Sequence, residues 1–285
     1  MTEVTAPTRV ILLVSAPDRP GLVADTTAYV RDVGGNIEEA EQHSTSGGVF
    51  VQRMQLAVPG STDLEQLRAG VAAITAGDVT CHEVGARTRA ALFVSRAGHA
   101  AYDVMSRVAL GSLPIEVVCI VSDHSDHADL ARRFDVPFLG IPVEGRSREE
   151  HEAEVLRSIT PFGVELIVLA RYMRILTADF LERAGVPAIN VHHSLLPAFI
   201  GAGAYQRAWD RGVKLIGATA HYATVDLDEG PIIAQAATGV SHRDDPEDLA
   251  RRGRELESAV LAQAIAAHCE FRVVLVGHRT IIFED

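Results

Sequence analysis

Hydrophobic residues in the first third of the chain alternate between strand-like and helix-like spacing. An apolar strand at 8–15 runs into the turn 18–21, and apolar residues then recur at helical intervals as far as Val33. The remaining pattern predicts strands at 36–44, 49–58 and 79–84 and a helix at 63–75. The order β-α-β-β-α-β is that of a ferredoxin-like module.

After a junction at 85–89, strand-like and helix-like segments alternate. We predict strands at 90–95, 115–121, near 138 and at 164–170, and helices at 99–110, 126–134 and 147–159. Such alternation is typical of a mostly parallel sheet with helices on both faces, in which ligands bind beyond the carboxyl ends of the strands. A long helix at 245–268 and two short strands at 272–276 and 280–283 are expected to close this part of the chain.

The predicted fold class is therefore α/β with two domains. A ferredoxin-like βαββαβ domain occupies 1–86, and a Rossmann-like, mostly parallel, doubly wound domain occupies 87–285. The length of 285 residues and a hydrophobic content of 47% are sufficient for two cores.

Charge and composition narrow the class of partner. A net charge of -12 disfavours nucleic acid and anionic membranes. The start of the chain has no basic region, and its apolar run at 10–14 is too short for a signal or membrane segment, so we expect a cytoplasmic protein. Cys81, Cys119 and Cys269 are widely spaced in apolar surroundings and are expected to be buried thiols.

Candidate chemistry concentrates between residues 188 and 235. Asn190 and His192 lie at the end of a short apolar strand, and residues two apart in extended chain point to the same side. A second strand at 214–222 is followed by a turn at 227–231, which is rich in Asp, Gly and Pro and carries Asp228. Both segments end where a ligand cleft is expected.

These three side chains suit chemistry at a carbonyl group. The amide NH2 of Asn190 can donate to a developing oxyanion. His192 can donate when protonated or pass a proton to a leaving amine. Asp228 can hold that imidazole charged and accept a proton from attacking water, so no Ser or Cys nucleophile is required.

The complete pattern resembles that of a known family. Asn-x-His-x-Ser-Leu-Leu-Pro at 190–197, followed by His-Tyr at 221–222 and Leu-Asp-x-Gly-Pro-Ile-Ile at 227–233, is similar to the signature of enzymes that use 10-formyltetrahydrofolate. The variant at 192–199, with Gly-Ala-Thr-Ala-His-Tyr at 217–222, looks most like the deformylase branch. The resemblance implies a formyltransferase-type catalytic domain that hydrolyses 10-formyltetrahydrofolate to formate and tetrahydrofolate, balancing folate pools and supplying formate for purine biosynthesis.

The same resemblance implies further site residues. His221 would support Asp228, and the pterin ring would be bordered by Arg174, Ile175 and Leu176. The alternatives are that His221 is a satisfied interior His and that the two aliphatic residues are plain core.

Three neighbours of these residues are given no role. His193 is expected to point away from His192 because adjacent residues of an extended segment face opposite sides. Asp226 and Glu229 could compete with Asp228, which alone matches the motif.

The N-terminal module resembles an ACT domain through its segments at 18–23 and 35–37. By that resemblance an amino-acid effector, methionine or glycine, would bind near Asp18, Gly21 and Asn36, and the modules would pair into a homo-oligomer. The alternative is a module that serves only to pair subunits.

We assign neither a metal nor a cofactor to two other motifs. The cluster at 123–127 follows a strand but matches no zinc spacing, so no metal site is predicted. The glycine-rich stretch at 201–204 follows a Leu-Pro loop rather than a strand, so it is interpreted as a loop beside the cleft and not as a dinucleotide site. At the positions of Gly203 and Ala204, family members often have a basic residue and a proline. This chain lacks both, so its sequence does not indicate how the acidic tail of the substrate is bound. No cofactor is expected, because the formyl folate is the substrate.

Four rival functions stay open. A formyltransferase of the glycinamide ribonucleotide type would be expected to carry a glycine-rich phosphate loop, whereas the stretch 95–102 has one Gly and a bulky His. A transfer-RNA formyltransferase would need a further C-terminal domain. A non-catalytic amino-acid sensor, or a metal hydrolase built on 123–127, is disfavoured by Asn190, His192 and Asp228.

Overall fold

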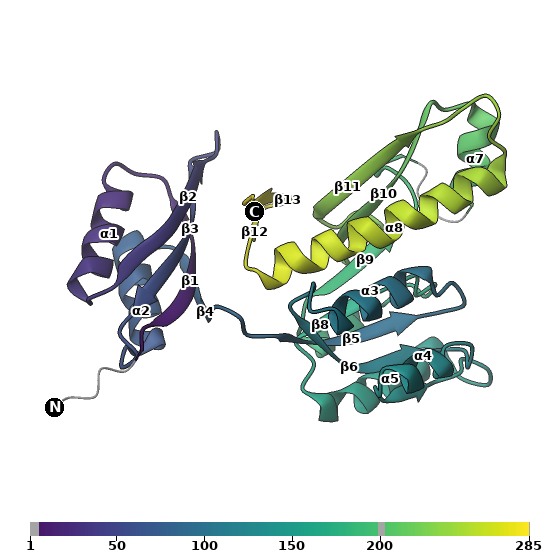
Figure 1. Cartoon of the computed structure of the whole chain (residues 1–285), viewed down its shortest axis with the longest axis horizontal. Coiled ribbons are helices and arrows are strands. Elements are labelled where there is room, and N and C mark those ends of the chain that lie inside the picture. The colour runs from purple at the N-terminus through teal and green to yellow at the C-terminus, as the bar shows by residue number, and fades with distance from the viewer. Residues whose placement is uncertain (1–5, 199–202, 285) are drawn as a thin grey trace. The chain divides into compact units, whose positions relative to one another are not determined.

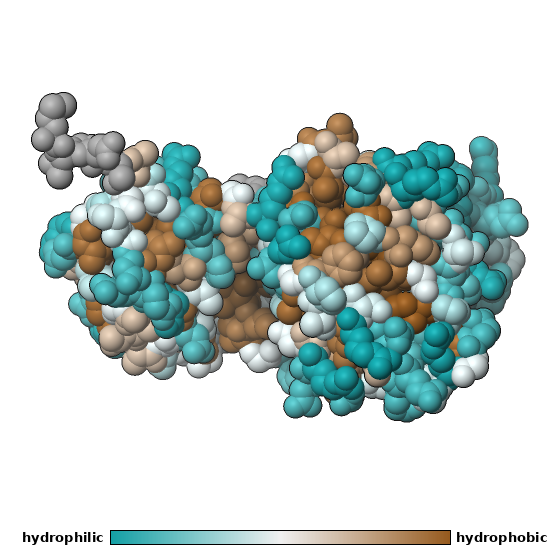
Figure 2. All heavy atoms as spheres, turned by 90° about the horizontal axis from the view of Figure 1, so that it is seen from below, coloured by the Kyte–Doolittle hydropathy of each residue, from teal (hydrophilic) through white to brown (hydrophobic). Residues whose placement is uncertain are grey.

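The computed structural model describes residues 6–198 and 203–284. The chain forms two compact units, the first comprising residues 1–86 with 270–285 and the second comprising 87–269. No helix in the described part of the chain is long and apolar enough to cross a membrane. The face in Figure 2 shows hydrophilic and hydrophobic residues interspersed on each unit.

The first unit has the predicted order of elements. It contains β1 (Thr8–Pro17), α1 (Leu22–Asp32), β2 (Asn36–Ser44), β3 (Val49–Val58), α2 (Leu64–Thr75) and β4 (Asp78–Glu83). The strands form an antiparallel sheet in the order β2-β3-β1-β4. Alternate residues of β1 and β3, such as Val10, Leu12 and Met54, pack in the core with Val30 of α1 and Val71 of α2.

The last residues of the chain belong to this first unit. The hairpin β12 (Val273–Val276) and β13 (Arg279–Ile282) contributes Val274 and the following Phe283 to a cluster with Val51 of β3. The second compact unit is therefore shorter than the predicted domain 87–285, by residues 270–285. Strand patterning predicted the hairpin but could not assign it to a unit, because any apolar surface can receive such a pair.

The second unit is a doubly wound α/β structure (Figure 1). Its strands are β5 (Thr88–Val94), β6 (Ile115–Ser122), β7 (Phe138–Gly140), β8 (Leu166–Leu169), β9 (Ala188–His192), β10 (Leu215–Tyr222) and β11 (Ile232–Gly239). They form the order β11-β10-β9-β8-β5-β6-β7. The five strands from β9 to β7 are parallel, and β10 and β11 are antiparallel additions, so the predicted mostly parallel sheet is confirmed.

Helices separate these strands in the sequence. They are α3 (His99–Ala109), α4 (Ala128–Arg133), α5 (Arg148–Ile159), the 3₁₀ turn η1 (Thr160–Phe162), α6 (Ala178–Ala184), α7 (Ala204–Arg211) and α8 (Pro246–Cys269). Residues of α5 and α6, including Val155 and Phe180, pack against Phe93 of β5 and Leu169 of β8. Helix α8 contacts α3 and runs along β9, β10 and β11 (Figure 1). The chain winds outward from β5 in both directions, which leaves the carboxyl ends of β8 and β9 free to carry a site.

Candidate active site

The site begins where parallel strand β9 meets antiparallel strand β10. Asn190 and His221 are direct partners in this ladder, and His192 is paired with Thr219. Opposite residues of an antiparallel pair carry their side chains on the same face. Accordingly Asn190 Nδ2 lies 3.2 Å from His221 Nε2.

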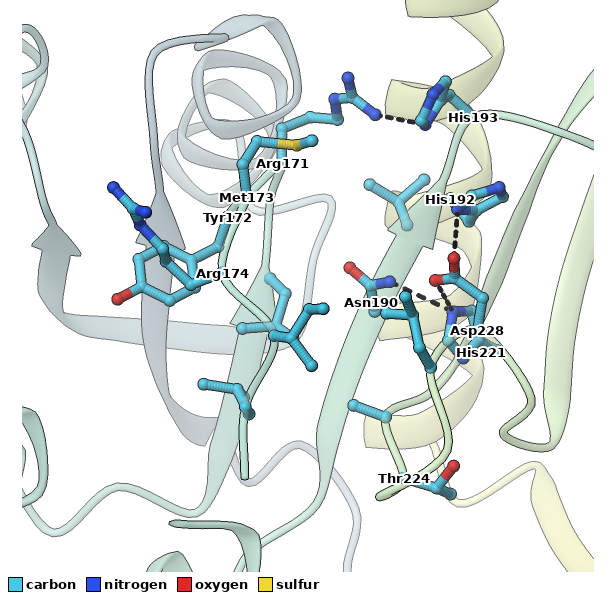
Figure 3. Close-up of a pocket in the computed structure, with 16 residues that line it drawn as sticks. Arg171, Tyr172, Met173, Arg174, Asn190, His192, His193, His221, Thr224 and Asp228 are labelled. Atoms are coloured by element: carbon cyan, nitrogen blue, oxygen red, sulfur yellow. Dashed lines mark hydrogen bonds and ion pairs between the residues drawn. The ribbon is translucent and has the colours of Figure 1, made fainter. Parts of the chain in front are cut away.

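Asp228 reaches the same place from the loop between β10 and β11 (Figure 3). Its Oδ2 lies 3.1 Å from His192 Nδ1, and its Oδ1 lies 3.7 Å from His221 Nε2. Its φ of 58° is in the left-handed region, which Asp tolerates better than most residues. The structure thus brings together the three residues predicted to act at a carbonyl and the predicted supporting His.

Hydrogen bonding assigns the ring nitrogens. His221 Nδ1 lies 2.9 Å from the carbonyl oxygen of Tyr222, which can only accept, so Nδ1 carries a proton. His192 Nδ1 donates in the same way to the Asp228 carboxylate. His192 Nε2 is buried without a hydrogen-bond partner, so it is the nitrogen left for a ligand.

The carboxylate of Asp228 is held in its charged form. Burial alone would raise its pKa, but the hydrogen bond from His192 and the proximity of His221 outweigh burial and hold the pKa well below the ordinary value. The side chain of Asp228 is only 5% exposed, so these two imidazoles are its main compensation. The same hydrogen bond fixes the orientation of the His192 ring.

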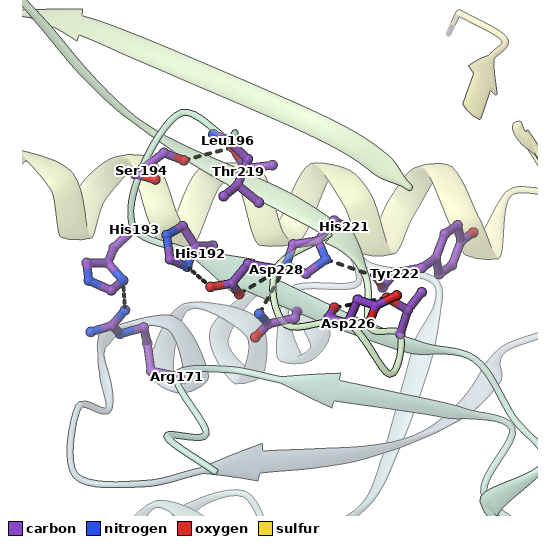
Figure 4. A network of polar contacts seen from close by, with 12 residues as sticks. Arg171, His192, His193, Ser194, Leu196, Thr219, His221, Tyr222, Asp226 and Asp228 are labelled. Carbon is purple, nitrogen blue, oxygen red and sulfur yellow. Dashed lines mark hydrogen bonds and ion pairs between the residues drawn. The ribbon is translucent and has the colours of Figure 1, made fainter. Parts of the chain in front are cut away.

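A buried threonine fixes the loop that follows His192 (Figure 4). Thr219 Oγ1 donates to the carbonyl oxygen of Ser194 at 2.8 Å and accepts from the backbone NH of Leu196 at 3.1 Å. Gln235 Nε2 donates to the same hydroxyl at 2.9 Å. The chain leaving His192 is therefore anchored to β10 and β11, which restricts the movement of the imidazole.

Asn190, His192, His221 and Asp228 face a cavity of about 260 Å³. Arg174, Ile175 and Leu176, predicted to border a pterin ring, lie on its wall together with Asn190, His192, His221 and Asp228. Leu176 also belongs to the core, whereas Ile175 is 52% exposed and is not a core residue. Further apolar wall comes from Leu169, Met173 and Leu227.

Among the polar lining residues, sequence reasoning gave no role to Arg171 and His193. Arg171 lies two residues beyond the end of β8, and ligands commonly bind beyond the carboxyl ends of such strands, so this signal was available. The prediction that His193 points away from His192 is wrong: both rings line the cavity with centroids 4.8 Å apart, because β9 ends at His192 and strand alternation does not extend to the next residue. Arg171 Nη1 lies 2.7 Å from His193 Nδ1.

Asp123 and His127, at the two ends of the cluster at 123–127, form hydrogen bonds with other protein groups. Ser95 Oγ donates to Asp123 Oδ1 at 2.9 Å, and Arg174 Nε donates to Asp123 Oδ2 at 2.7 Å. His127 Nε2 lies 3.2 Å from the carbonyl oxygen of Arg96. Within residues 6–198 and 203–284, no three His, Cys, Asp or Glu side chains are arranged to hold a metal ion. Of the predicted loop at 201–204, Gly201 and Ala202 lie outside the described residues, and Gly203 precedes α7.

The candidates in the first unit do not meet within one chain. Asp18 lies at the end of β1 beside Gly48, and Gly21 begins α1. Asn36 starts β2 opposite Ala57, at the other end of the sheet. Because α1 returns along β1, the two ends are roughly 25 Å apart.

Comparisons with known proteins agree with this architecture. The family model for formyl transferases matches residues 88–265, and that for ACT domains matches residues 10–69. A formyltetrahydrofolate deformylase of Mycobacterium tuberculosis is 43% identical over 279 residues, which cover 95% of this chain and 90% of that protein. That of Bacillus subtilis is 41% identical over 278 residues, covering 95% and 93%.

Solved structures give the same relation. A formyltetrahydrofolate deformylase from Pseudomonas syringae superposes with a TM-score of 0.92 at 35% identity, covering 99% of this chain and 96% of that one. A glycinamide ribonucleotide transformylase from Symbiobacterium toebii has a TM-score of 0.67 at 34% identity and covers 71% of this chain and 97% of its own.

The fold and the site define a formyl transferase domain joined to an ACT domain. The chain belongs to the formyltetrahydrofolate deformylase family.

Proposed function

We propose that the protein hydrolyses 10-formyltetrahydrofolate to formate and tetrahydrofolate. The observation that carries the proposal is the convergence of Asn190, His192 and Asp228 on one cavity, with His192 Nε2 buried and unpartnered. Full-length similarity to deformylases supports water as the acceptor of the formyl group.

In the proposed reaction, water attacks the formyl carbon and the carbonyl π electrons move to oxygen. The ionised carboxylate of Asp228 orients the water and takes a proton from it as the new C–O bond forms. Asn190 Nδ2 and the protonated Nε2 of His192 donate to the oxyanion. Collapse of the tetrahedral intermediate breaks the C–N bond, and N10 takes a proton from His192. Formic acid and tetrahydrofolate leave, the acid ionises to formate in water, and the proton held by Asp228 passes to His192 across their hydrogen bond.

The cavity wall supports a flat aromatic substrate. Arg174, Ile175 and Leu176 offer backbone groups and an aliphatic edge, and the exposed Met173 and Leu227 extend the apolar surface. We propose that the pterin lies against this wall. No cofactor is required in this scheme, because the substrate itself carries the formyl group.

The start of α3 supports hydrolysis over transfer to a phosphorylated amine. Gly98 is the N-cap of α3, and the next residue, His99, directs Nε2 at the Glu257 carboxylate, 2.9 Å away. Burial alone would raise the pKa of Glu257, but the bond from His99 and the charge of Arg171 lower it, so an ionised Glu257 holds the His99 ring. A stretch with one glycine followed by this tethered imidazole is a poor cradle for a phosphate group.

The ACT domain supports regulation by an amino acid, and methionine or glycine is proposed as the effector. A cytoplasmic homo-oligomer is part of the same proposal. Since Asp18 and Gly21 are distant from Asn36 within one chain, a shared site would need the Asn36 of a second copy.

The deciding experiment measures formate release from the purified full-length protein supplied with 10-formyltetrahydrofolate. We expect formate and tetrahydrofolate to appear in equal amounts with water as the only acceptor. Tetrahydrofolate that appears only with glycinamide ribonucleotide, together with the formylated amine, would establish a transferase. Binding of an amino acid without turnover of the folate would establish a sensor.

A glycine in the Asp228 loop provides a separate test of the geometry. A Cβ on Gly230 would lie 1.7 Å from the Tyr222 carbonyl oxygen and 3.2 Å from His221 Nδ1. Gly230→Ala must therefore displace the loop, and we expect kcat to fall by at least about tenfold and the free energy of unfolding by roughly 1–3 kcal/mol. Gly239→Ala is the matched control, because nothing lies within 4 Å of its added Cβ. Equal kcat values for the two variants would contradict the placement of Asp228.

A further inference from the structure

A buried charged network extends from the site to α8. Arg171 Nε lies 3.3 Å from Glu257 Oε2, and its Nη1 lies 2.7 Å from His193 Nδ1 (Figure 3). Glu257, whose side chain is 1% exposed, also accepts a bond of 2.7 Å from the Tyr205 hydroxyl and lies 2.9 Å from His99 Nε2. The mechanism described above uses none of these groups.

The contact between Arg171 and His193 fixes the protonation of His193. A guanidinium has only donors, so His193 Nδ1 must present its lone pair. A proton on Nδ1 would face the donor and the positive charge of Arg171. Burial, then the charges of Arg171 and His192, lower the pKa of His193 to about 4.

The backbone of Arg171 places its side chain there. Arg171 has a φ of 63°, in the left-handed region that a long side chain rarely adopts, and its carbonyl oxygen accepts from the backbone NH of Ser95 at 3.3 Å. Glu257 compensates the buried guanidinium. An unusual backbone conformation stabilised by such surroundings is often found at a functional position.

The two imidazoles are close enough to compete for a proton. The rings of His192 and His193 are 4.8 Å apart between centroids, and two positive charges at that separation repel each other. Carboxylates attract a proton to both rings: Asp228 bonds His192 directly, and Glu257 and Asp228 each tend to raise the pKa of His193. Tyr205, whose ring centroid lies 5.6 Å from that of His193, is neutral, and His99 is directed at Glu257.

We propose that Arg171 is a positioning residue that holds His193 as a neutral acceptor, so that His192 alone exchanges the proton of the reaction. The proposal deepens the deformylase function and rests on it. Asp228 stabilises a proton on one imidazole, and Arg171 repels a proton from its neighbour. A pair of adjacent His residues is thereby divided into one that transfers protons and one that does not.

The test compares pH profiles of the full-length enzyme. In Arg171→Met the pKa of His193 should rise above about 4, because the repulsion by Arg171 is lost, but burial, the larger cause, still holds it below the ordinary value. A larger fraction of His193 is then protonated on the acidic side than in the wild type, and this second positive charge opposes the proton that His192 exchanges. We expect kcat/KM of this variant to decline more steeply than that of the wild type as the pH falls from about 7.5 to 5.

Two further variants separate this effect from general damage. Arg171→Met/His193→Gln lacks the second titrating ring and should lose the additional acidic decline. Arg171→Lys keeps a cation and should retain a profile closer to that of the wild type. Superimposable profiles for Arg171→Met and the wild type, or an acidic decline that persists in the double variant, would overturn the proposal.

A measurement that needs no substrate tests the protonation of His193 independently of the proposed reaction. NMR titration of protein labelled with ¹⁵N-histidine, assigned with His193→Gln, should place the pKa of His193 below that of an ordinary His and show its rise in Arg171→Met. An ordinary pKa for His193 in the wild type would overturn the proposal. If the titration agrees but the wild type releases no formate, the pairing stands and the proposed reaction fails.

Discussion

Asp228→Asn is expected to reduce kcat by about 10³- to 10⁴-fold while leaving the fold intact. The amide has the shape of the carboxylate but cannot take a proton from water. It also removes the negative charge that faces His192 Nδ1, 3.1 Å away. Loss of the base and of the charged partner of His192 from one substitution explains why this effect should be among the largest in the chain.

Asp226→Asn is the matched control for this prediction. Asp226 is an exposed residue of the same loop, and only its proximity in the sequence made it an alternative candidate for the role of Asp228. Its kcat should stay within about twofold of the wild type, because exposed charges are screened. The measurements are initial rates of tetrahydrofolate formation and thermal unfolding of each variant. A kcat for Asp228→Asn above about a tenth of the wild-type value would show that another group activates the water.

The fold could be predicted where the hydrophobic pattern itself decides it. The buried parallel strands read as continuous apolar runs, and Ala90 to Val94 of β5 are all fully buried. Helix α6 was missed because only Phe180 of its seven residues is buried, so no helical period is visible. Its Thr177 cap, which accepts from the NH of Phe180, was the remaining signal.

The same distinction applies to the site: some of its residues follow a local sequence pattern, and others meet only through tertiary contacts. Asn190 and His192 were predictable because they share a short strand, and Asp228 because its turn carries a recognisable motif. The network of Arg171, His193 and Glu257 was not, because it depends on a left-handed loop residue and on a helix from a distant part of the chain. Tertiary contacts of this kind leave no periodic trace in a sequence.

His192→Asn is expected to lower kcat by about 10²- to 10⁴-fold, and it separates the two nitrogens of the imidazole. The amide nitrogen of Asn can replace Nδ1 as the donor to Asp228, so the buried carboxylate keeps a partner. Nothing replaces Nε2, the buried and unpartnered nitrogen that the proposed mechanism assigns to the substrate. The oxyanion then loses a donor, and the departing N10 loses its acid.

The comparison of His192→Asn with His192→Ala makes this assignment testable. Both variants lack Nε2 and should have similar kcat values, but only alanine leaves Asp228 without its main donor, so His192→Ala should be the less stable to thermal unfolding. His242→Asn, at an exposed position, controls for the loss of an imidazole as such and should leave kcat unchanged. Near-normal turnover in His192→Asn would show that Nδ1 suffices, and the proton delivered to N10 would then have to come from another group.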